Sequence, residues 1–496
     1  MTEPLKKYII AIDQGTTSCR SILFDKNGNI IGTEQKEFKQ ILPENGWVEH
    51  DPIEILNTQT QTLKDLINNN HIDVKEIDSI GITNQRETTV LWNKRTGQPV
   101  YNAIVWQDNR TIDFCEKLKR KDLTELISTK TGLVIDSYFS STKINWILEN
   151  CDEAKKALKE ENLLFGTIDT WLIWNLTQNH YTDVTNASRT QLFNINTLCW
   201  DEELLEIFNV PSKILPEVKE CSDYFGEWNF NGINIPILGV AGDQQAALFG
   251  QNCFDAGMAK NTYGTGCFML TNTGINAIKS ENGLLTTIAW SIDGQVNYEL
   301  EGSVFVAGAA VQWLRDSLKI IKESHETEKF AELSSSEDVV FVPAFSGLGA
   351  PYWNMNVKGG IFGLTRNSNI QDLCKATLQS LAFQTRDVIQ SMEKDAGLSI
   401  KELAVDGGAC ANNFLMQFQA DILNTEIIRP KIIESTAWGA ALLAGLKSNF
   451  FVLNDIKSNR SVEKKFNPSM PPENRKNWIK KWEKAIEALI AMYDQH

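Results

Sequence analysis

Short apolar runs separated by tight polar turns open the chain. One apolar run spans Tyr8 to Ile12, a second follows from Arg20 to Phe24, and apolar residues return at Ile30 after Asp25, Asn27, Gly28 and Asn29. Gly and Asn adopt the positive φ angles that tight hairpins need. The pattern therefore predicts strand, turn, strand, turn, strand, with the first turn held at the end of a rigid sheet.

The first turn, within IDQGTTSCR (12–20), collects groups that suit a triphosphate and its cation. Asp13 brings a carboxylate, and Thr16, Thr17 and Ser18 bring hydroxyls next to backbone N–H groups. Residues of these types also fill ordinary surface turns, so the motif alone leaves both interpretations open.

A second hairpin of the same kind follows near the middle of the chain. In AKNTYGTGCFMLTNTG (259–274), an apolar approach leads to the turn at Gly264, Thr265 and Gly266, and an apolar run leaves it. Two phosphate-type hairpins, one near the start of each half, predict two similar domains that face each other across a cleft. This outline resembles an actin-like ATPase fold.

Length and composition fit that division. The 496 residues exceed what one core usually organises and suit two domains of roughly 250 residues, which we place at 1–250 and 251–496. The second domain is expected to end in an amphipathic helix from Lys476 to Tyr493.

Charge, cysteine usage and hydropathy narrow the class of protein. A formal charge of −15 argues against nucleic acid and acidic membrane surfaces as partners and favours small molecules. The nine cysteines are scattered without a CxxC pair, which predicts reduced thiols in a cytoplasmic protein. No apolar run is long enough to span a bilayer, and no signal peptide pattern opens the chain, so no membrane insertion is expected.

Ten motifs carry a resemblance to a known family. In chain order they are IDQGTTSCR, WVEHDP, GITNQRE, AIVWQDNRT, FGTIDTWLIW, TNASRT, AGDQQAALFGQ, NTYGTGCFML, PAFSGLGAPYW and DGGACANNFLMQFQADIL, from about Tyr8 to Leu446. On these motifs the chain resembles the FGGY carbohydrate kinase family, and within it the members that phosphorylate glycerol. The resemblance implies an α/β fold with two actin-like (ribonuclease H-like) domains, each a mixed β-sheet flanked by helices, facing across a catalytic cleft.

The same resemblance implies the reaction and the partners. We expect ATP-dependent phosphorylation of glycerol to sn-glycerol 3-phosphate in glycerol catabolism, with ATP and Mg²⁺ as cofactors. A homodimer or homotetramer is expected as well.

Glycerol offers three hydroxyls and a short carbon chain, so a selective pocket needs polar groups and an apolar wall. By resemblance the acceptor site consists of Arg86, Glu87, Trp106, Tyr138, Asp243, Gln244 and Phe268. Without the family, Arg86 and Glu87 would be interpreted as a surface ion pair, and Trp106 and Phe268 as core residues. Only the ordered set of motifs favours binding.

Asp243 is the expected general base. It follows the apolar segment 237–240 and precedes a run of small residues that predicts a helix. A carboxylate within hydrogen-bond reach can orient the weakly nucleophilic hydroxyl and take its proton. The alternative is a helix N-cap, a role that Asn would fill equally well.

The donor site is assigned by the same resemblance. Asp13 would organise the metal, and Arg20 would add positive charge near the transferred group, so that Asp243, Asp13 and Arg20 form the catalytic set. The remaining nucleotide contacts are expected from Thr16, Thr17, Ser18, Arg20, Thr265, Gly308, Gln312, Gly408 and Asn412. Without the family, 405–413 is an Asp-Gly-Gly turn with an Asn cap.

Two other functions compete with this one. An FGGY kinase for another polyol or sugar, such as xylulose or gluconate, would keep the hairpins, but GITNQRE with Trp106 and Tyr138 favours glycerol. A non-enzymatic actin-like ATP-binding protein would have no reason to combine Arg86, Glu87 and Asp243.

Overall fold

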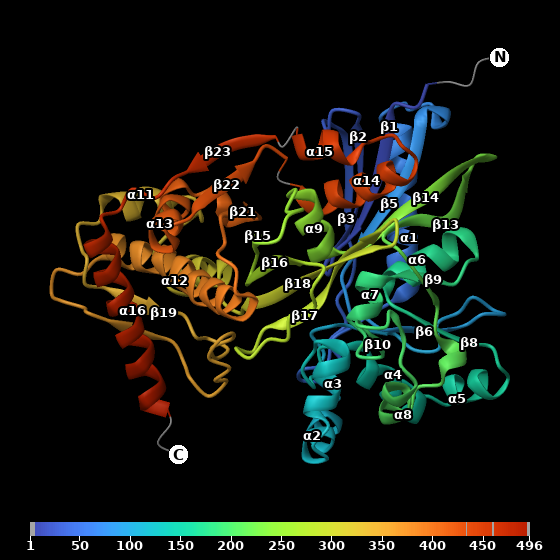
Figure 1. The fold of residues 1–496 in the computed structure, drawn as a ribbon, viewed down its shortest axis with the longest axis horizontal. Helices are drawn as coiled ribbons and strands as arrows, with labels where there is room; N and C mark the ends of the chain where they lie inside the picture. Colours follow the sequence, from blue (N-terminus) through green and yellow to red (C-terminus); the bar gives the residue numbers. More distant parts are fainter. Residues whose placement is uncertain (1–4, 433, 459–460, 494–496) are drawn as a thin grey trace.

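Two large β-sheets organise the protein in the computed structural model, which describes residues 5–432, 434–458 and 461–493 (Figure 1). The first sheet has the strand order β13-β14-β5-β1-β2-β3. Its strands are β1 (Tyr8–Gln14), β2 (Ser18–Asp25), β3 (Ile30–Glu37), β5 (Ile77–Asn84), β13 (Ser222–Phe230) and β14 (Ile233–Gly242). Strands β1, β5 and β14 are parallel, whereas β2, β3 and β13 run antiparallel to their neighbours. The sheet is therefore mixed, as the family resemblance predicts.

The second sheet repeats this design. Its order is β17-β18-β16-β15-β21-β22-β23, with an antiparallel hairpin β15/β16 beside the parallel strands β21 and β22. The strands are β15 (Met258–Tyr263), β16 (Cys267–Gly274), β17 (Leu285–Ile292), β18 (Gln295–Val304), β21 (Glu402–Asp406), β22 (Glu426–Pro430) and β23 (Val462–Phe466). The predicted repeat of the hairpin is confirmed, because β15/β16 stands in the second sheet where β1/β2 stands in the first.

Helices cover both faces of the first sheet. Ile10 and Ile12 of β1 pack with α1 (Pro52–Asn69) and α6 (Ile168–Thr177). The alternate residues Ile9 and Ala11 pack with α14 (Ser435–Lys447), which comes from far along the chain. Because successive side chains point to opposite faces of a strand, a strand buried on both sides becomes continuously apolar. This explains the unbroken run at the start of the chain.

Helix α14 approaches its neighbours closely enough to require glycine. A Cβ on Gly81 of β5 would lie 2.1 Å from the Ala440 carbonyl oxygen of α14. A Cβ on Gly439 of α14 would lie 1.8 Å from the Ala246 oxygen of α9 (Asp243–Gly250). Helix α9 leads the chain from the first sheet to the second, and α14 packs beside it (Figure 1). The two elements that cross between the sheets thus form one tightly packed pair.

The second sheet packs against its own helices, α11 (Glu326–Leu333), α12 (Ile370–Ala396), α13 (Asn413–Leu423) and α16 (Pro472–Tyr493). In α16, Trp478 and Trp482 are buried, and Trp482 stacks on Phe383 of α12 with 5.1 Å between ring centroids. The predicted amphipathic helix at the end of the chain is confirmed.

Smaller elements complete the molecule. The helices are α2 (Ile112–Arg120), α3 (Thr124–Thr131), α4 (Ser140–Asn150), α5 (Asp152–Lys159), α7 (Val184–Ser188), α8 (Glu202–Phe208), α10 (Gly308–Gln312) and α15 (Leu453–Ser458). The short 3-10 and π turns are η1 (Val74–Glu76), η2 (Ser212–Ile214), η3 (Trp313–Ser317) and η4 (Gly408–Ala411). The short strands are β4 (Glu49–His50), β6 (Val90–Asn93), β7 (Ala103–Ile104), β8 (Leu163–Gly166), β9 (Tyr181–Asp183), β10 (Phe193–Asn194), β11 (Cys199–Trp200), β12 (Glu217–Lys219), β19 (Val340–Val342) and β20 (Gly360–Phe362).

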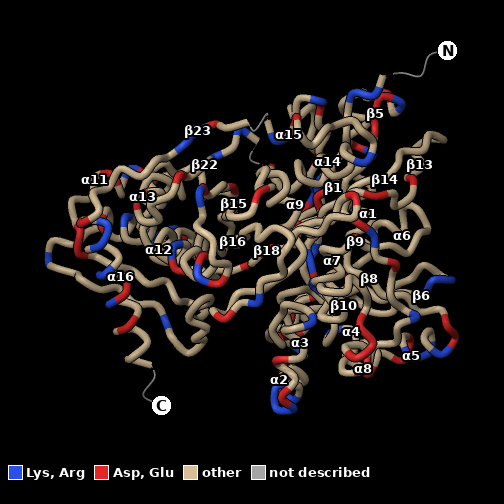
Figure 2. Tube along the Cα trace, viewed as in Figure 1, with Lys and Arg blue, Asp and Glu red and all other residues tan. Residues whose placement is uncertain are grey.

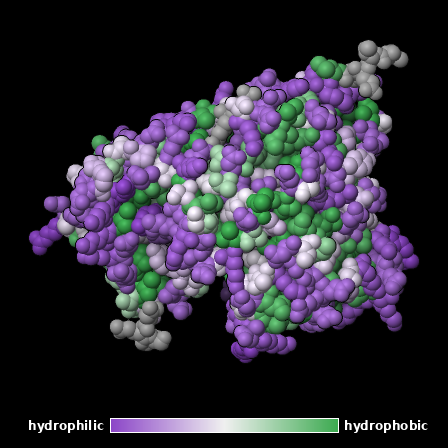
Figure 3. Space-filling view, viewed as in Figure 1, coloured by the Kyte–Doolittle hydropathy of each residue, from purple (hydrophilic) through white to green (hydrophobic). Residues whose placement is uncertain are grey.

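Positively and negatively charged residues are interspersed along the outer helices and loops (Figure 2). Figure 3 shows a face that is mainly hydrophilic with several hydrophobic patches, and an indentation at its lower edge between the part that holds α12 and α16 and the part that holds α2 and α3. Among the described residues, no helix combines the length and the apolar character that crossing a membrane needs.

Candidate active site

The first hairpin places a carboxylate and a guanidinium side by side. Asp13 at the end of β1 pairs across the sheet with Arg20 of β2, and their side chains meet at 2.5 Å. A second guanidinium nitrogen of Arg20 lies 2.6 Å from Glu434, just before α14. The turn is closed by the Gly15 N–H, which donates to the Ser18 carbonyl at 2.9 Å. Thr16, Thr17 and Ser18 therefore lie at the rim of the sheet, where they are partly or fully exposed.

Arg86 and Glu87 follow β5 directly and are buried, with 3% and 1% of their surface exposed. They are therefore not the surface ion pair that their composition alone suggests. Glu87 has φ 57°, in the left-handed region that few residues other than glycine adopt. This backbone conformation is typical of positions that a functional site constrains.

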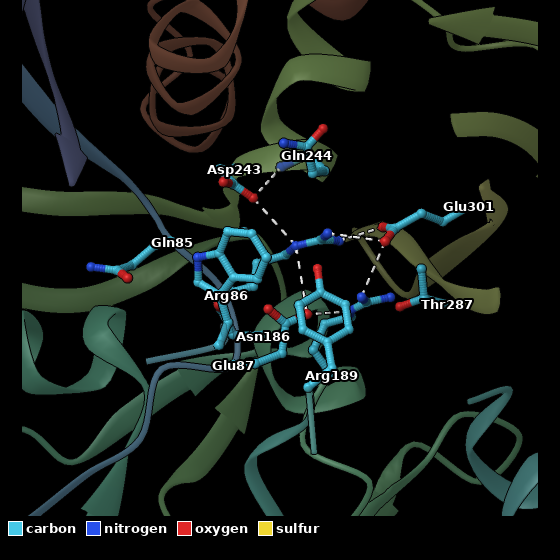
Figure 4. Close-up of polar contacts among 12 residues, drawn as sticks. Gln85, Arg86, Glu87, Asn186, Arg189, Asp243, Gln244, Thr287 and Glu301 are labelled. Atoms are coloured by element: carbon cyan, nitrogen blue, oxygen red, sulfur yellow. Dashed lines mark hydrogen bonds and ion pairs between the residues drawn. The ribbon is translucent and has the colours of Figure 1, made fainter. Parts of the chain in front are cut away.

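A buried network of four charges fixes these two side chains (Figure 4). Two Arg86 nitrogens donate to both oxygens of Glu301 at 2.6 and 3.1 Å. Arg189 donates to Glu87 at 2.6 Å and to Glu301 at 3.1 Å. Buried ions are stable only when each has a well-placed partner, and the alternation of two cations with two anions provides one.

Asp243 stands next to this network as the first residue of α9. The N-cap of α9 is Gly242, so the interpretation of Asp243 as a helix cap is wrong. Its carboxylate accepts from the Gln244 N–H at 2.7 Å and lies 3.3 Å from Arg86 Nε. The side chain keeps 32% of its surface and so can be reached from solvent. Enclosure by protein still raises the pKa of Asp243 to about 6, although Arg86 opposes the rise.

Three half-buried aromatic rings form one cluster. Trp106 meets Tyr138 with 5.5 Å between ring centroids and Phe268 with 6.5 Å. The Trp106 indole N–H donates to Thr16 Oγ1 at 3.1 Å. Since Thr16 belongs to the first hairpin and Phe268 follows the turn of the second, Trp106 contacts both hairpins. Partial exposure of all three rings distinguishes them from core residues.

The second hairpin packs against the start of α10. The Gly308 N–H donates to the Gly264 oxygen at 3.0 Å, and the Ala309 N–H donates to the Thr265 oxygen at 3.1 Å. A Cβ on Gly308 would lie 2.5 Å from the Gly264 oxygen, so this contact requires glycine. Thr265 and Gly308 are thus brought together, with Gln312 exposed at the end of the same helix.

The loop after β21 lies beside this hairpin, because β15 and β21 are parallel neighbours that end together. Gly408 is exposed there. Asn412 caps α13 by accepting from the Leu415 N–H at 2.9 Å. The cap that composition alone predicts is therefore present, and contact of Asn412 with a nucleotide stays a prediction.

Sequence reasoning assigned no role to several residues that the structure places here. Arg189 lies in the TNASRT motif, Lys260 opens the second hairpin, and Glu301 lies in β18. In β18, Glu299 and Glu301 occupy alternate positions within the buried stretch 298–302. Charges on the buried face of a strand indicate partners elsewhere, but the sequence does not say which.

No three His, Cys, Asp or Glu side chains within the described ranges are grouped so as to hold a metal by themselves. Mg²⁺ in phosphoryl-transfer sites is commonly held by one or two carboxylates together with substrate phosphates and water. Asp13, beside a hydroxyl-rich turn, fits that ligand set.

The two sheets share one design, and each carries a hairpin that contains glycine and hydroxyl residues. A solvent-accessible acid lies beside a buried charge network. Together these features define an actin-like phosphotransferase. Residues 8–250 match the model of the FGGY family of carbohydrate kinases, N-terminal domain, and residues 259–448 match that of the C-terminal domain. The chain therefore belongs to the FGGY family of carbohydrate kinases.

Relatives match over nearly the full length. A glycerol kinase of Treponema denticola is 58% identical over 97% of this chain and 99% of its own, and one of Clostridium botulinum is 56% identical over 99% and 100%. The crystal structure of Plasmodium falciparum glycerol kinase with ADP superposes with a TM-score of 0.93 at 39% identity, over 98% of this chain and 99% of that one. A xylulose kinase from Lactobacillus acidophilus, at 24% identity and TM-score 0.87 over 99% of both chains, shares the fold.

Proposed function

We propose that this chain transfers the γ-phosphoryl group of ATP to a primary hydroxyl of glycerol, releasing ADP and sn-glycerol 3-phosphate in glycerol catabolism. The observation that carries the proposal is the acceptor cluster, in which Arg86 and Glu87 are held rigidly beside Asp243. Identity of 56–58% to full-length relatives named glycerol kinase supports it.

The acceptor side suits a small uncharged triol. Arg86 offers N–H donors, Glu87 offers acceptor oxygens, and Gln244 adds an amide, while Trp106 and Phe268 provide apolar surface for the carbon chain. Burial raises the pKa of Tyr138, so its phenol stays neutral and serves as a hydroxyl partner. A site that pairs each hydroxyl discriminates against analogues that lack one, because its buried groups are then left unpaired.

Asp243 is proposed as the general base. With a pKa of about 6 its carboxylate is mainly ionised at neutral pH and remains basic enough to accept a proton. As the acceptor oxygen forms its bond to phosphorus, the hydroxyl proton passes to Asp243 and the bond to the ADP oxygen breaks in line. Arg86, 3.3 Å away, holds the carboxylate in place.

The donor side is proposed to lie between the two hairpins. Thr16, Thr17 and Ser18 would contact the phosphates from one side, and Thr265 and Gly308 from the other. Phosphoryl transfer needs mainly positioning and charge neutralisation, which supports this arrangement of hydroxyls and backbone N–H groups.

Further along the second sheet, Gln312, Gly408 and Asn412 are proposed to face the nucleoside part. Asp13 would hold Mg²⁺, which supplies neutralisation of phosphate charge when bound. Arg20 is already paired with Asp13 and Glu434, and its role toward the transferred group stays a prediction.

Cytoplasmic location and assembly into homodimers or homotetramers are proposed from the family resemblance. The described cysteines carry thiols rather than disulfides, which suits a reducing compartment. Sedimentation of the purified protein would decide the assembly.

The test of the function is ADP formation from Mg-ATP with glycerol, xylulose, gluconate, dihydroxyacetone and no acceptor in parallel. Strong stimulation by glycerol, with sn-glycerol 3-phosphate as product, is expected. Stimulation by another polyol alone would support a carbohydrate kinase and overturn glycerol as its acceptor. Absence of stimulation by every acceptor would overturn the enzymatic function.

A further inference from the structure

We propose that Lys260 and Glu301, two buried charged side chains of the second sheet, are positioning residues that orient Gln244 and Arg86 for acceptor binding. The proposal rests on the proposed function and deepens it. It assigns specificity for the acceptor to residues in the part of the chain that otherwise serves the nucleotide.

Glu301 fixes the plane of the Arg86 guanidinium. It lies in β18 with 1% of its surface exposed, and its two oxygens accept from two Arg86 nitrogens at 2.6 and 3.1 Å. Such a two-point pair sets orientation as well as distance. With both ends of the guanidinium fork engaged by Glu301, Arg86 Nε is left on the side of Asp243, 3.3 Å from its carboxylate (Figure 4).

Arg189 provides a second guanidinium that holds Glu301 in place. It contacts Glu301 at 3.1 Å and Glu87 at 2.6 Å, so it joins the anion behind Arg86 to the acceptor carboxylate. Burial alone would raise the pKa of Glu301, but Arg189 and Arg86 outweigh that effect and hold the pKa at about 2. Glu301 is thus ionised throughout the working pH range.

Lys260 fixes the amide of Gln244. The lysine lies in β15 with 0% of its surface exposed, and its ammonium group donates to Gln244 Oε1 and, at 2.9 Å, to Thr262 Oγ1. An ammonium group has donors and no acceptor. The Gln244 carbonyl oxygen must therefore face Lys260. The NH₂ group of Gln244 is then left to donate a hydrogen bond to a hydroxyl group of the substrate that accepts the phosphoryl group.

The orienting charges and the oriented residues belong to different sheets. Arg86 follows β5 of the first sheet and Gln244 lies in α9 after β14, whereas Lys260 and Glu301 belong to β15 and β18. Arg86 and Glu301 are separated by 215 residues in the chain. The hydrogen-bond donors of Arg86 and Gln244 are consequently oriented for the acceptor only when the second sheet is in place.

A matched control stands on the same strand. Glu299 is two residues before Glu301, with 0% of its surface exposed. Neither of its carboxylate oxygens has a hydrogen-bond partner in the described structure. Burial raises the pKa of Glu299 well above its usual value, because it disfavours the charged form. Glutamine has nearly the shape of glutamic acid, and Glu299→Gln therefore changes a buried acid of β18 that has no hydrogen bond to Arg86 or Gln244 in the described structure.

The experiment measures kcat and the KM values for glycerol and ATP in the wild type, Glu301→Gln, Lys260→Met and Glu299→Gln, together with calorimetric binding of glycerol without ATP. For Glu301→Gln and Lys260→Met, we expect the glycerol KM to rise about tenfold or more, with the ATP KM within about twofold. Glu301→Asp, which keeps the charge, should recover part of the loss. Glu299→Gln should match the wild type.

Glycerol KM values within about twofold of the wild type in both variants would overturn the proposal. So would a parallel loss of kcat and of both substrate affinities that follows the fraction of folded protein in thermal unfolding, since that indicates a structural role alone. Failure of the proposed function is recognised separately, in a wild type that does not use glycerol. The KM of each variant relative to the wild type is then measured with the acceptor that the wild type does use. In a wild type without turnover, the affinities for polyols are compared instead.

Discussion

At the scale of single residues, we expect the charge of Asp243 to matter most for turnover. Asp243→Asn keeps the shape of the side chain and removes its ability to take a proton. We expect kcat to fall by about 10² to 10⁴, the usual contribution of a general base. Glycerol affinity should change little, because Arg86 keeps its pairs with Glu301 and Glu87. Steady-state turnover and glycerol titration by calorimetry check both statements, and near-normal turnover would remove Asp243 as the base.

The pH dependence of the reaction follows from the same carboxylate. Its pKa is raised from 3.8 to about 6, so protonation inactivates the base at a higher pH than for an exposed aspartate. We expect kcat/KM for glycerol to be level near pH 7 and to fall about tenfold per pH unit below about pH 6. A rate profile between pH 5 and 8 measures this fall, and a profile that stays level to pH 5 would contradict the role of Asp243.

Arg86 shows how the structure changes an expectation from sequence. The resemblance to the FGGY family predicts that Arg86→Ala weakens glycerol binding. The structure adds a loss of stability, because Glu301 and Glu87 would keep their buried charges with one cation fewer. Removing one partner of a buried pair typically costs about 3–5 kcal/mol of unfolding free energy. Urea unfolding should show a loss of this size, and an unchanged midpoint would contradict the buried network.

At the scale of elements, the packing of α14 on α9 predicts that a glycine-to-alanine substitution inside a helix lowers the stability of the protein instead of raising it. Alanine in place of glycine inside a helix ordinarily stabilises by about 1 kcal/mol. In Gly439→Ala the new Cβ would lie 1.8 Å from the Ala246 oxygen, so α14 must shift away from α9. We expect a net loss of about 1–3 kcal/mol and a melting temperature lower by several degrees.

The control for this prediction is Gly264→Ala in the second hairpin, where the nearest atom to an added Cβ is 3.6 Å away. Its melting temperature should stay within a degree or so of the wild type. A Gly439→Ala protein that melts at or above the wild type would show that the helices separate without cost.

The elements near the hairpins could be predicted from sequence, because their signals are local. Short apolar runs and turn residues place β1, β2 and β3 within a few residues of their observed bounds. The partners of Arg86 could not be predicted, since nothing near position 86 indicates a carboxylate at position 301. The covering of the first sheet by α14 was missed for the same reason. The division at residue 250 stays a prediction.

At the scale of the whole molecule, the site draws on both sheets and so depends on how they approach each other. ATP must be kept from water while glycerol is the acceptor, and closure of the two halves achieves this. We expect the radius of gyration from small-angle X-ray scattering to fall when glycerol and a non-hydrolysable ATP analogue are added together. Glycerol with the analogue omitted is the control. An unchanged radius with both ligands would show that catalysis proceeds without closure.

The position of α14 also has a consequence for the making of the protein. The apolar residues Ile9, Ala11, Ile22 and Phe24 of the first sheet are covered by a helix that begins at Ser435. A ribosome must therefore synthesise almost the entire chain before that face can be closed. We expect nascent chains to display an open apolar sheet through most of translation and to depend on chaperones for that period. Interrupted synthesis would leave an aggregation-prone fragment, although most of the acceptor residues would already be present in it.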